Sequence, residues 1–340
     1  MSSCDDKRPI DRIRQSALSM QIGDPEDGAA SVMIDMGSAR YVLKERAIYT
    51  VQLADQVDPE RTNVAVPNTQ QRILSIGTHD PEVGRIFLTA YTMFKSMHLG
   101  TSFSERDAWS HAFEYLRDIV AMMEIRSALV KAIEEAVAGF NKVVAKDRSI
   151  TLPALGNAEE RCDAFAQKMG HAIDTLKAVA RLFYPKELSK KWIDSLTLVA
   201  AHKHGEHEPL ARFMKEKGST LLFMRELRNM IEHPQVDVYV RVRDFQFLPS
   251  MELVAPSVDI VRPGEGPIAG PLASFMAQVI EELVSSAEVF FALLCGANAK
   301  TFSGFPLSVV ELPPNCRPNW NPHQRFSYGI MMNGELHPLG

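Results

Sequence analysis

The chain has 340 residues, of which 46% are hydrophobic and 23% are charged, and its formal net charge at pH 7 is −5. This composition is typical of a globular protein and excludes a disordered chain. The acidic balance argues against a broadly basic surface that coats nucleic acid, although it is compatible with a local basic site.

Cysteine spacing and the absence of long apolar runs restrict the class further. No two of Cys4, Cys162, Cys295 and Cys316 have a C-x-x-C spacing, so we expect free thiols and no zinc ribbon. Polar residues open the chain where a signal peptide needs an apolar segment. The strongest apolar run, 289–295, is far shorter than the roughly 18 residues of a spanning helix. We therefore expect a cytoplasmic protein with no membrane partner.

The first part of the chain, residues 1–75, has mixed character and contains no recognisable chemistry. Asp-Pro and Val-Pro-Asn sequences punctuate it into short segments. Within it, the segment from Tyr41 to Asp55 is compatible with a helix. We therefore expect an N-terminal extension that packs on a core or follows its surface.

Residues 76–296 show helical spacing of apolar residues over most of their length. Ser104 stands three residues before Asp107, an arrangement typical of a helix N-terminus, and Tyr184-Pro185 favours a helix end. The apolar spacing and these end signals predict helices over about 81–98, 105–140, 158–183, 186–201, 210–214, 218–233 and 271–295.

The apolar period changes from 3.6 to 2 directly after residue 235. Valines at 236, 238, 240 and 242 alternate with polar residues, which predicts a strand, and 251–254 and 258–261 are candidate partners in an antiparallel hairpin. The tail, 297–340, is rich in Pro, Asn and Gly and is expected to be irregular. The predicted fold is mainly α: a helical bundle of about four principal helices, 76–296, with a small antiparallel β-insertion, 236–262, before the last helix.

Polar side chains gather at the end of the helix predicted over 218–233. Arg225, Asn229 and His233 follow one another at i, i+4 and i+8 and therefore form one line along the helix, and Arg228 is expected within reach of the same strip. Pro234 disfavours helical geometry at His233, so the helix should end there. An imidazole near its neutral range suits a general acid or base.

The sequence Arg228-Asn229-x3-His233 resembles the motif of HEPN domains, which are helical bundles marked by Arg, four to six residues and His, with a polar residue after the Arg. The resemblance implies metal-independent RNA cleavage in a homodimer, with a composite site where two motif helices face each other, as in a toxin or defence effector. It implies no metal and no cofactor. DNA would not be cut, because the reaction needs the ribose 2′-hydroxyl.

The same resemblance implies roles for individual residues. His233 would activate the 2′-hydroxyl or protonate the leaving oxygen, Arg228 would hold the phosphate, and Asn229 would orient one of these groups. The candidate RNA-binding residues are Arg225 and, on the polar face of the following strand, Arg241 and Arg243.

Several alternatives stay open at this point. Arg106-Asp107-x3-His111 fits the same pattern, but it lies early in a long helix, so the copy at 228–233 is preferred for its position. Gln235 stands where some family members carry Tyr. The alternative function is a non-catalytic helical dimer that binds a protein partner or a nucleotide. The histidines of 202–208 favour a solvated turn over a metal site, and Cys162 favours a buried thiol.

Overall fold

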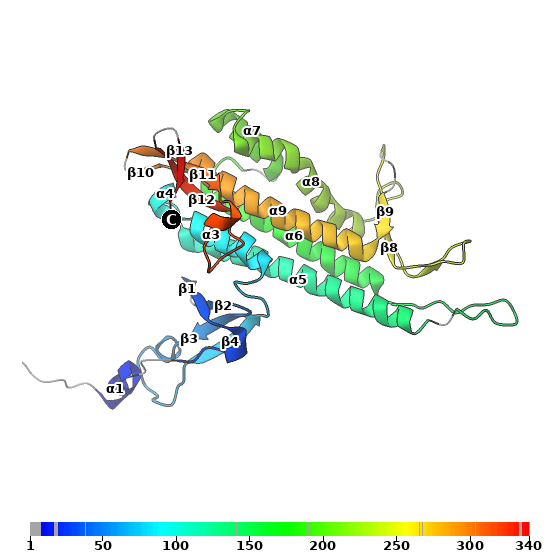
Figure 1. Ribbon diagram of the computed structural model, residues 1–340, viewed down its shortest axis with the longest axis horizontal. Helices are drawn as coiled ribbons and strands as arrows, with labels where there is room; N and C mark the ends of the chain where they lie inside the picture. The colour runs from blue at the N-terminus through cyan, green and yellow to red at the C-terminus, as the bar shows by residue number, and fades with distance from the viewer. Residues whose placement is uncertain are drawn as a thin grey trace, which may run out of the picture.

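Four long helices that lie side by side form the centre of the molecule (Figure 1). The structure is a computed structural model that describes residues 8–16, 20–37, 39–140, 142–188, 191–264, 266, 268–302, 304–332 and 335–339. The long helices are α5 (Glu105–Ala138), α6 (Ala158–Phe183), α8 (Pro209–Glu232) and α9 (Leu272–Asn298). The other helical segments are α1 (Pro9–Ser16), α2 (Ala54–Val57), a π-helix (Val83–Leu88), α3 (Thr89–Met93), α4 (Ser96–Leu99), α7 (Trp192–His204) and short 3₁₀ turns at Pro25–Asp27 and Pro314–Cys316. Among the helices described, none has the length and apolar character needed to cross a bilayer.

All strands of the described residues pair in an antiparallel manner, in four sheets. The N-terminal sheet has the order β1 (Ala30–Met36), β2 (Ala39–Lys44), β3 (Ile48–Gln52) and β4 (Thr69–Leu74). Between α8 and α9, β5 (Tyr239–Arg243), β8 (Ser257–Val261) and β9 (Ile268–Pro271) form one sheet, and β6 (Gln246–Phe247) and β7 (Leu253–Val254) form another. The C-terminal sheet contains β10 (Thr301–Phe302), β11 (Phe305–Glu311), β12 (Phe326–Met332) and β13 (Glu335–Pro338).

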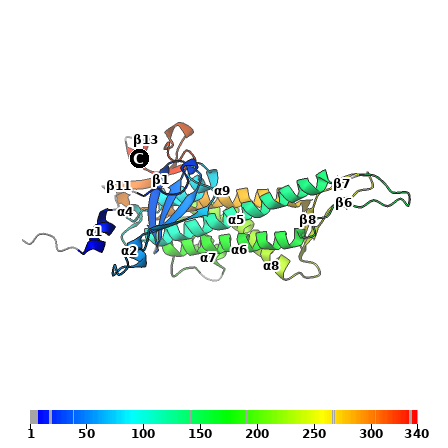
Figure 2. The same ribbon diagram turned by 90° about the horizontal axis from the view of Figure 1, so that it is seen from below.

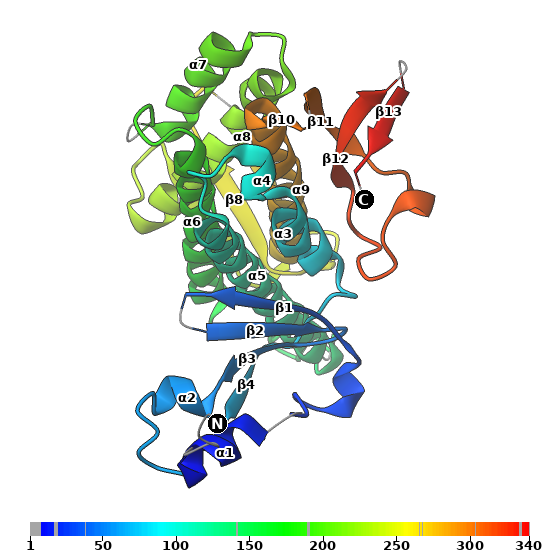
Figure 3. The same cartoon turned by 90° about the vertical axis from the view of Figure 1, so that its left-hand side faces the viewer.

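The sheets occupy separate places around the bundle. The N-terminal sheet lies beside the first half of α5, and β5–β9 lie at the far end of the long helices (Figures 1 and 2). The C-terminal sheet packs near α9 and α3, away from the N-terminal sheet (Figure 3). The end of α8 therefore meets the strands that follow it, at a distance from the other two sheets.

The prediction of a mainly α bundle is wrong, because the chain has a mixed α and β fold with 50% helix and 19% strand. The segment 41–55, expected as a helix, forms most of β2 and β3, and the tail expected to be irregular contains β10–β13. Both errors concern segments whose strands are stabilised by pairing and by packing on the helices, which local sequence patterns do not report. The domain boundaries at 75 and 296 stay a prediction.

Two local sequence features explain where α5 begins and how closely α8 packs on α7. The Ser104 hydroxyl accepts a hydrogen bond from the Asp107 backbone N–H at 3.3 Å, so the capping arrangement at the start of α5 is confirmed. The short helix over 210–214 and the helix over 218–233 form one helix, α8. Gly218 lies inside it, where a Cβ would come within 3.2 Å of Ile193 of α7, so its small size permits close packing.

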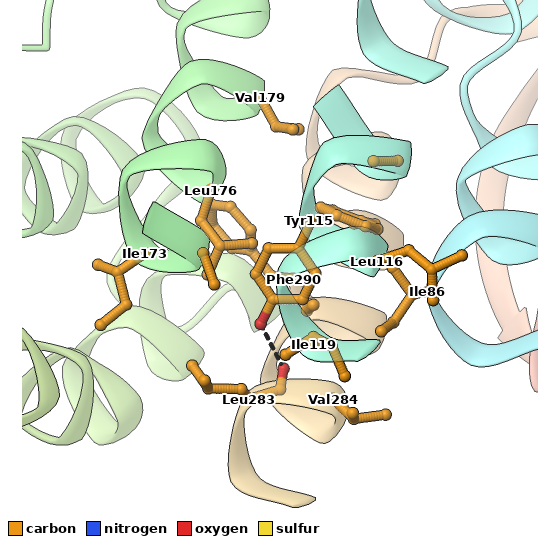
Figure 4. Close-up of a cluster of buried hydrophobic side chains, with 14 of the residues drawn as sticks. Ile86, Tyr115, Leu116, Ile119, Ile173, Leu176, Val179, Leu283, Val284 and Phe290 are labelled. Carbon is orange, nitrogen blue, oxygen red and sulfur yellow. Dashed lines mark hydrogen bonds between the residues drawn. The ribbon is translucent and has the colours of Figure 1, made fainter. Parts of the chain in front are cut away.

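Aromatic and aliphatic side chains of α5, α6 and α9 form the centre of the core (Figure 4). Tyr115 is fully buried among them, and its hydroxyl donates a hydrogen bond of 2.8 Å to the Leu283 carbonyl of α9. Burial raises the pKa of this phenol far above its usual value, so the hydroxyl stays protonated as the donor. This bond satisfies a polar group that would be costly to bury without a partner.

Ion pairs and hydrogen bonds attach the C-terminal sheet to the helices. The fully buried Glu288 of α9 accepts hydrogen bonds at Oε2 from Arg85 Nε at 2.9 Å and Arg325 Nη1 at 3.2 Å. Burial raises the pKa of Glu288, and the two guanidinium groups oppose that rise. The Tyr328 hydroxyl of β12 donates to the Met93 carbonyl of α3 at 2.7 Å. The tail is therefore an integrated part of the fold.

Candidate functional site

The last turn of α8 leaves His233 at the surface. Its backbone N–H still donates to the Asn229 carbonyl at 2.8 Å, but its φ of −136° and ψ of 66° are not helical. The helix thus ends at the residue before Pro234, as the steric restriction imposed by proline predicts. The His233 side chain is exposed, and Asn229 is exposed one turn earlier.

A groove of about 640 Å³ runs beside this end of α8, and we call it the α8 groove. Asn229 and His233 both line it, because residues four apart lie only about 40° apart around a helix. The other walls come from the segment after the helix and from the end of β8. The complete lining is Glu226, Asn229, Met230, His233, Gln235, Val238, Arg262 and Pro263.

Arg228 does not line the α8 groove with His233. Its Nε donates a hydrogen bond of 3.0 Å to Glu232 Oε1, and its stem lies over Gly170 of α6, where a Cβ would come within 2.7 Å of Arg228 Cδ. Arg228 and His233 lie about 140° apart around the helix, which accounts for the separation. The expectation that Arg228 shares one strip with Asn229 and His233 is therefore corrected.

Arg262 is the guanidinium that the fold brings into the α8 groove. It directly follows β8, its side chain packs 4.4 Å from the centre of the Phe223 ring, and its Nη1 lies 3.6 Å from Glu226 Oε2. Antiparallel pairing explains this position: Tyr239 pairs with Val261, so the residue after β8 returns to the end of α8. The hairpin that the sequence predicts between 236–243 and 258–261 is the signal from which the position of Arg262 could have been predicted.

The three candidate RNA-binding arginines are not part of the groove lining. Arg243 pairs across the sheet with Asp259, with Nε and Nη2 each 2.7 Å from Oδ2. Arg241 is exposed and lies 5.1 Å from the centre of the Tyr239 ring, and Arg225 is half-buried on α8. Whether any of the three contacts RNA stays a prediction.

His204 and Cys162 are the two members of the other candidate groups whose surroundings the structure defines. His204 Nε2 lies 2.9 Å from the Tyr184 hydroxyl, and burial, together with Lys203, lowers the pKa of this histidine. No group of three His, Cys, Asp or Glu side chains suited to a metal ion occurs in the described part of the chain. Cys162 is buried, and burial raises its pKa to about 12, so its reactive thiolate form is disfavoured.

The second copy of the motif pattern lies elsewhere on the surface. The Nδ1 atom of His111, on α5, lies 3.3 Å from Glu114 Oε2. His111 also lines a polar depression between α5 and α6, together with His171 and Lys168. His111 is thus a matched control for experiments on His233.

The α8 groove is therefore lined by Asn229, His233 and Arg262, and Glu226 is the carboxylate that lies near Arg262. An imidazole, an amide and a guanidinium provide a proton-transfer group, an orienting group and an anion-binding group. Comparisons of the chain with protein-family models, with curated proteins and with solved structures gave no match.

Proposed function

We propose that the chain is a metal-independent endoribonuclease that cleaves RNA in the α8 groove and acts in the cytoplasm. The observation that carries this proposal is the exposed imidazole of His233, which shares an open groove with the amide of Asn229 and the guanidinium of Arg262. A side chain sealed in the core would have no access to a polymer. An exposed histidine that shares a groove with an arginine can reach a phosphodiester. The imidazole suits proton transfer, and the guanidinium suits phosphate binding.

In this proposal His233 moves a proton at the reacting phosphodiester. The ribose 2′-oxygen attacks the phosphorus, the 2′-hydroxyl proton passes to a base, and the 5′-oxygen leaves with a proton from an acid, which yields a 2′,3′-cyclic phosphate. Arg262 holds the phosphate oxygens and stabilises their developing charge, and Asn229 orients the ribose or the imidazole.

The reaction needs both a base and an acid, and the α8 groove of one chain contains one histidine. A homodimer in which two α8 ends face each other supplies the second imidazole, so we include a homodimer in the proposal. Size-exclusion chromatography with light scattering tests this point. A monomer at the concentrations at which RNA is cleaved contradicts the composite site.

The direct test of the function incubates the purified protein with end-labelled single-stranded RNA in EDTA. We expect RNA cleavage with 2′,3′-cyclic phosphate ends and no cleavage of a DNA of the same sequence, because the nucleophile is the 2′-hydroxyl. A substrate with one 2′-deoxy residue should be protected at that linkage. Equal cleavage of DNA, or activity that requires added Mg²⁺, contradicts the proposal.

Substitutions of Arg262 and of Arg228 are expected to have different effects in the same assay. Arg262→Gln should lower kcat/KM by about 10²–10³-fold, the usual loss when one donor to developing charge is removed. Arg228→Gln should change kcat/KM by less than about tenfold, since Arg228 lies against α6 and pairs with Glu232. A larger loss for Arg228→Gln, with unchanged stability in urea, contradicts the assignment to Arg262.

The alternative is a non-catalytic helical dimer that binds a protein partner or a nucleotide. The pairing of Arg228 with Glu232 favours it, since the motif arginine then has a structural role on its own helix. RNA binding or dimer formation without cleavage, in wild type and His233→Ala alike, supports this alternative.

A further inference from the structure

Another hollow is lined by residues of β1, of α3 and α4, of the loop that follows α4 and of the start of α5, and none of these residues lines the α8 groove. Its volume of about 540 Å³ falls within the range of small-molecule sites. We call it the β1 hollow. The residues that line it include the aromatic residues Tyr91, Phe103 and Trp109, together with Ser96 and Arg106.

A lysine, Lys95, packs on two of these aromatic rings. Lys95 Nζ lies 4.1 Å from the centre of the Tyr91 ring and 4.7 Å from that of Trp109, which is cation–π contact. Within the described residues its ammonium forms no ion pair and no side-chain hydrogen bond. Burial lowers the pKa of Lys95, and the negative charge of Glu105 opposes that shift. Lys95 does not itself line the hollow, and an anion there would add a counter-charge to that of Glu105.

The two carboxylates of the β1 hollow are already engaged. Asp35 accepts hydrogen bonds from Arg40 Nε at 2.8 Å and Nη2 at 3.0 Å. Glu105 Oε1 accepts from the Ser96 backbone N–H at 2.5 Å and from its hydroxyl at 2.6 Å. Asp35 is therefore paired with the Arg40 guanidinium, whereas Glu105 is held by neutral donors and its charge acts on Lys95.

Arg106 is the second cation available for a ligand. It is exposed and makes no hydrogen bond or ion pair within the described residues. Its charge adds to the lowering of the pKa of Asp35, which the hydrogen bond from Arg40 chiefly causes, so the guanidinium lies near the hollow. The indole N–H of Trp109 is buried without an acceptor in the part of the chain described, which leaves one more unused donor.

We propose that the β1 hollow binds a planar aromatic ring that carries a carboxylate or a phosphate. The ring packs against Tyr91 and Trp109, as aromatic side chains favour. The anionic group pairs with Arg106 in a charge-assisted hydrogen bond, and the positive field of Lys95 acts from behind the two rings. This site is separate from the α8 groove and does not depend on the RNA-cleavage proposal.

Isothermal titration calorimetry on the full chain tests the ligand class with four probes. These are 2-naphthoate, the neutral 2-naphthamide of the same shape, adenosine 5′-monophosphate as a phosphate-bearing ring, and acetate as a charge without a ring. We expect 2-naphthoate or the nucleotide to bind below millimolar concentration, and the amide and acetate to bind at least tenfold more weakly. The stronger of the two anionic rings identifies the carboxylate or the phosphate as the preferred group. Absence of binding by both, or equal binding of the amide, overturns the proposal.

Variants then test the residues. Arg106→Gln should weaken binding of the anionic ring about tenfold or more, whereas Arg117→Gln, also exposed on α5 but outside the hollow, should leave it unchanged. Lys95→Met should also weaken binding, and its unfolding midpoint in urea separates this loss from misfolding. Unchanged affinity in Arg106→Gln contradicts the proposed site.

Discussion

His233→Ala is expected to lower the rate of RNA cleavage by about 10²–10⁴-fold, the usual contribution of one positioned acid or base. His233 is exposed at the end of α8 and makes no side-chain hydrogen bond within the described residues, so its removal should leave the fold intact. The measurement is single-turnover cleavage of end-labelled RNA in EDTA, with the urea unfolding midpoint measured in parallel. This design separates lost chemistry from lost structure.

The matched control for this experiment is His111→Ala. His111 belongs to the second copy of the Arg-x4-His pattern and lies on α5, outside the α8 groove. It should retain wild-type cleavage. Equal activity in wild type and His233→Ala excludes the proposed role of His233, and a loss in His111→Ala alone moves the candidate site to the depression between α5 and α6.

Phe291→Ala is expected to lower the free energy of unfolding by about 3–5 kcal/mol, the usual cost of truncating a buried phenylalanine. Phe291 of α9 is fully buried, and its ring lies 5.2 Å from the ring of Phe94 and 6.3 Å from that of Tyr115. The truncation thus removes contacts that join α9 to Tyr115 of α5 and to Phe94, which directly follows α3. Urea unfolding followed by far-ultraviolet circular dichroism measures the change.

Phe305→Ala is the control for the core prediction. Phe305 is 48% exposed on β11, so its truncation should change stability by no more than about 0.5 kcal/mol. Equal destabilisation by the two variants contradicts the central role of the aromatic cluster around Phe291. A change in the slope of the urea transition would indicate an altered unfolded or native state.

The two β-sheets outside the insertion were missed for different physical reasons. In β2, the neighbours Val42 and Leu43 are both fully buried, so the strand lacks the alternation of exposed and buried residues that marks a half-buried strand. A short apolar run of this kind is compatible with a helix as well. In the tail, prolines at 313–322 separate strands that are stabilised by contacts from afar, such as Tyr328 with Met93.

The sequence by itself determined the local features of the candidate site. Proline at 234 ends α8 at His233, four-residue spacing puts Asn229 beside that histidine, and alternating valines predict the strand that follows. These features depend on backbone sterics and on helix and strand periods, which act over a few residues. A single sequence is sufficient to detect them.

Only the tertiary structure decided which arginine joins His233. Arg228 is five residues away in sequence, but its stem packs on Gly170 of α6, and Arg262 reaches the groove through the antiparallel pairing of β5 with β8. Strand pairing and helix packing bring together residues that are far apart in the chain. The absence of a side chain at Gly170 of α6 leaves room for the stem of Arg228 and so influences where that side chain lies. These contacts depend on the whole fold, so the motif alone could not predict which arginine lines the α8 groove with His233.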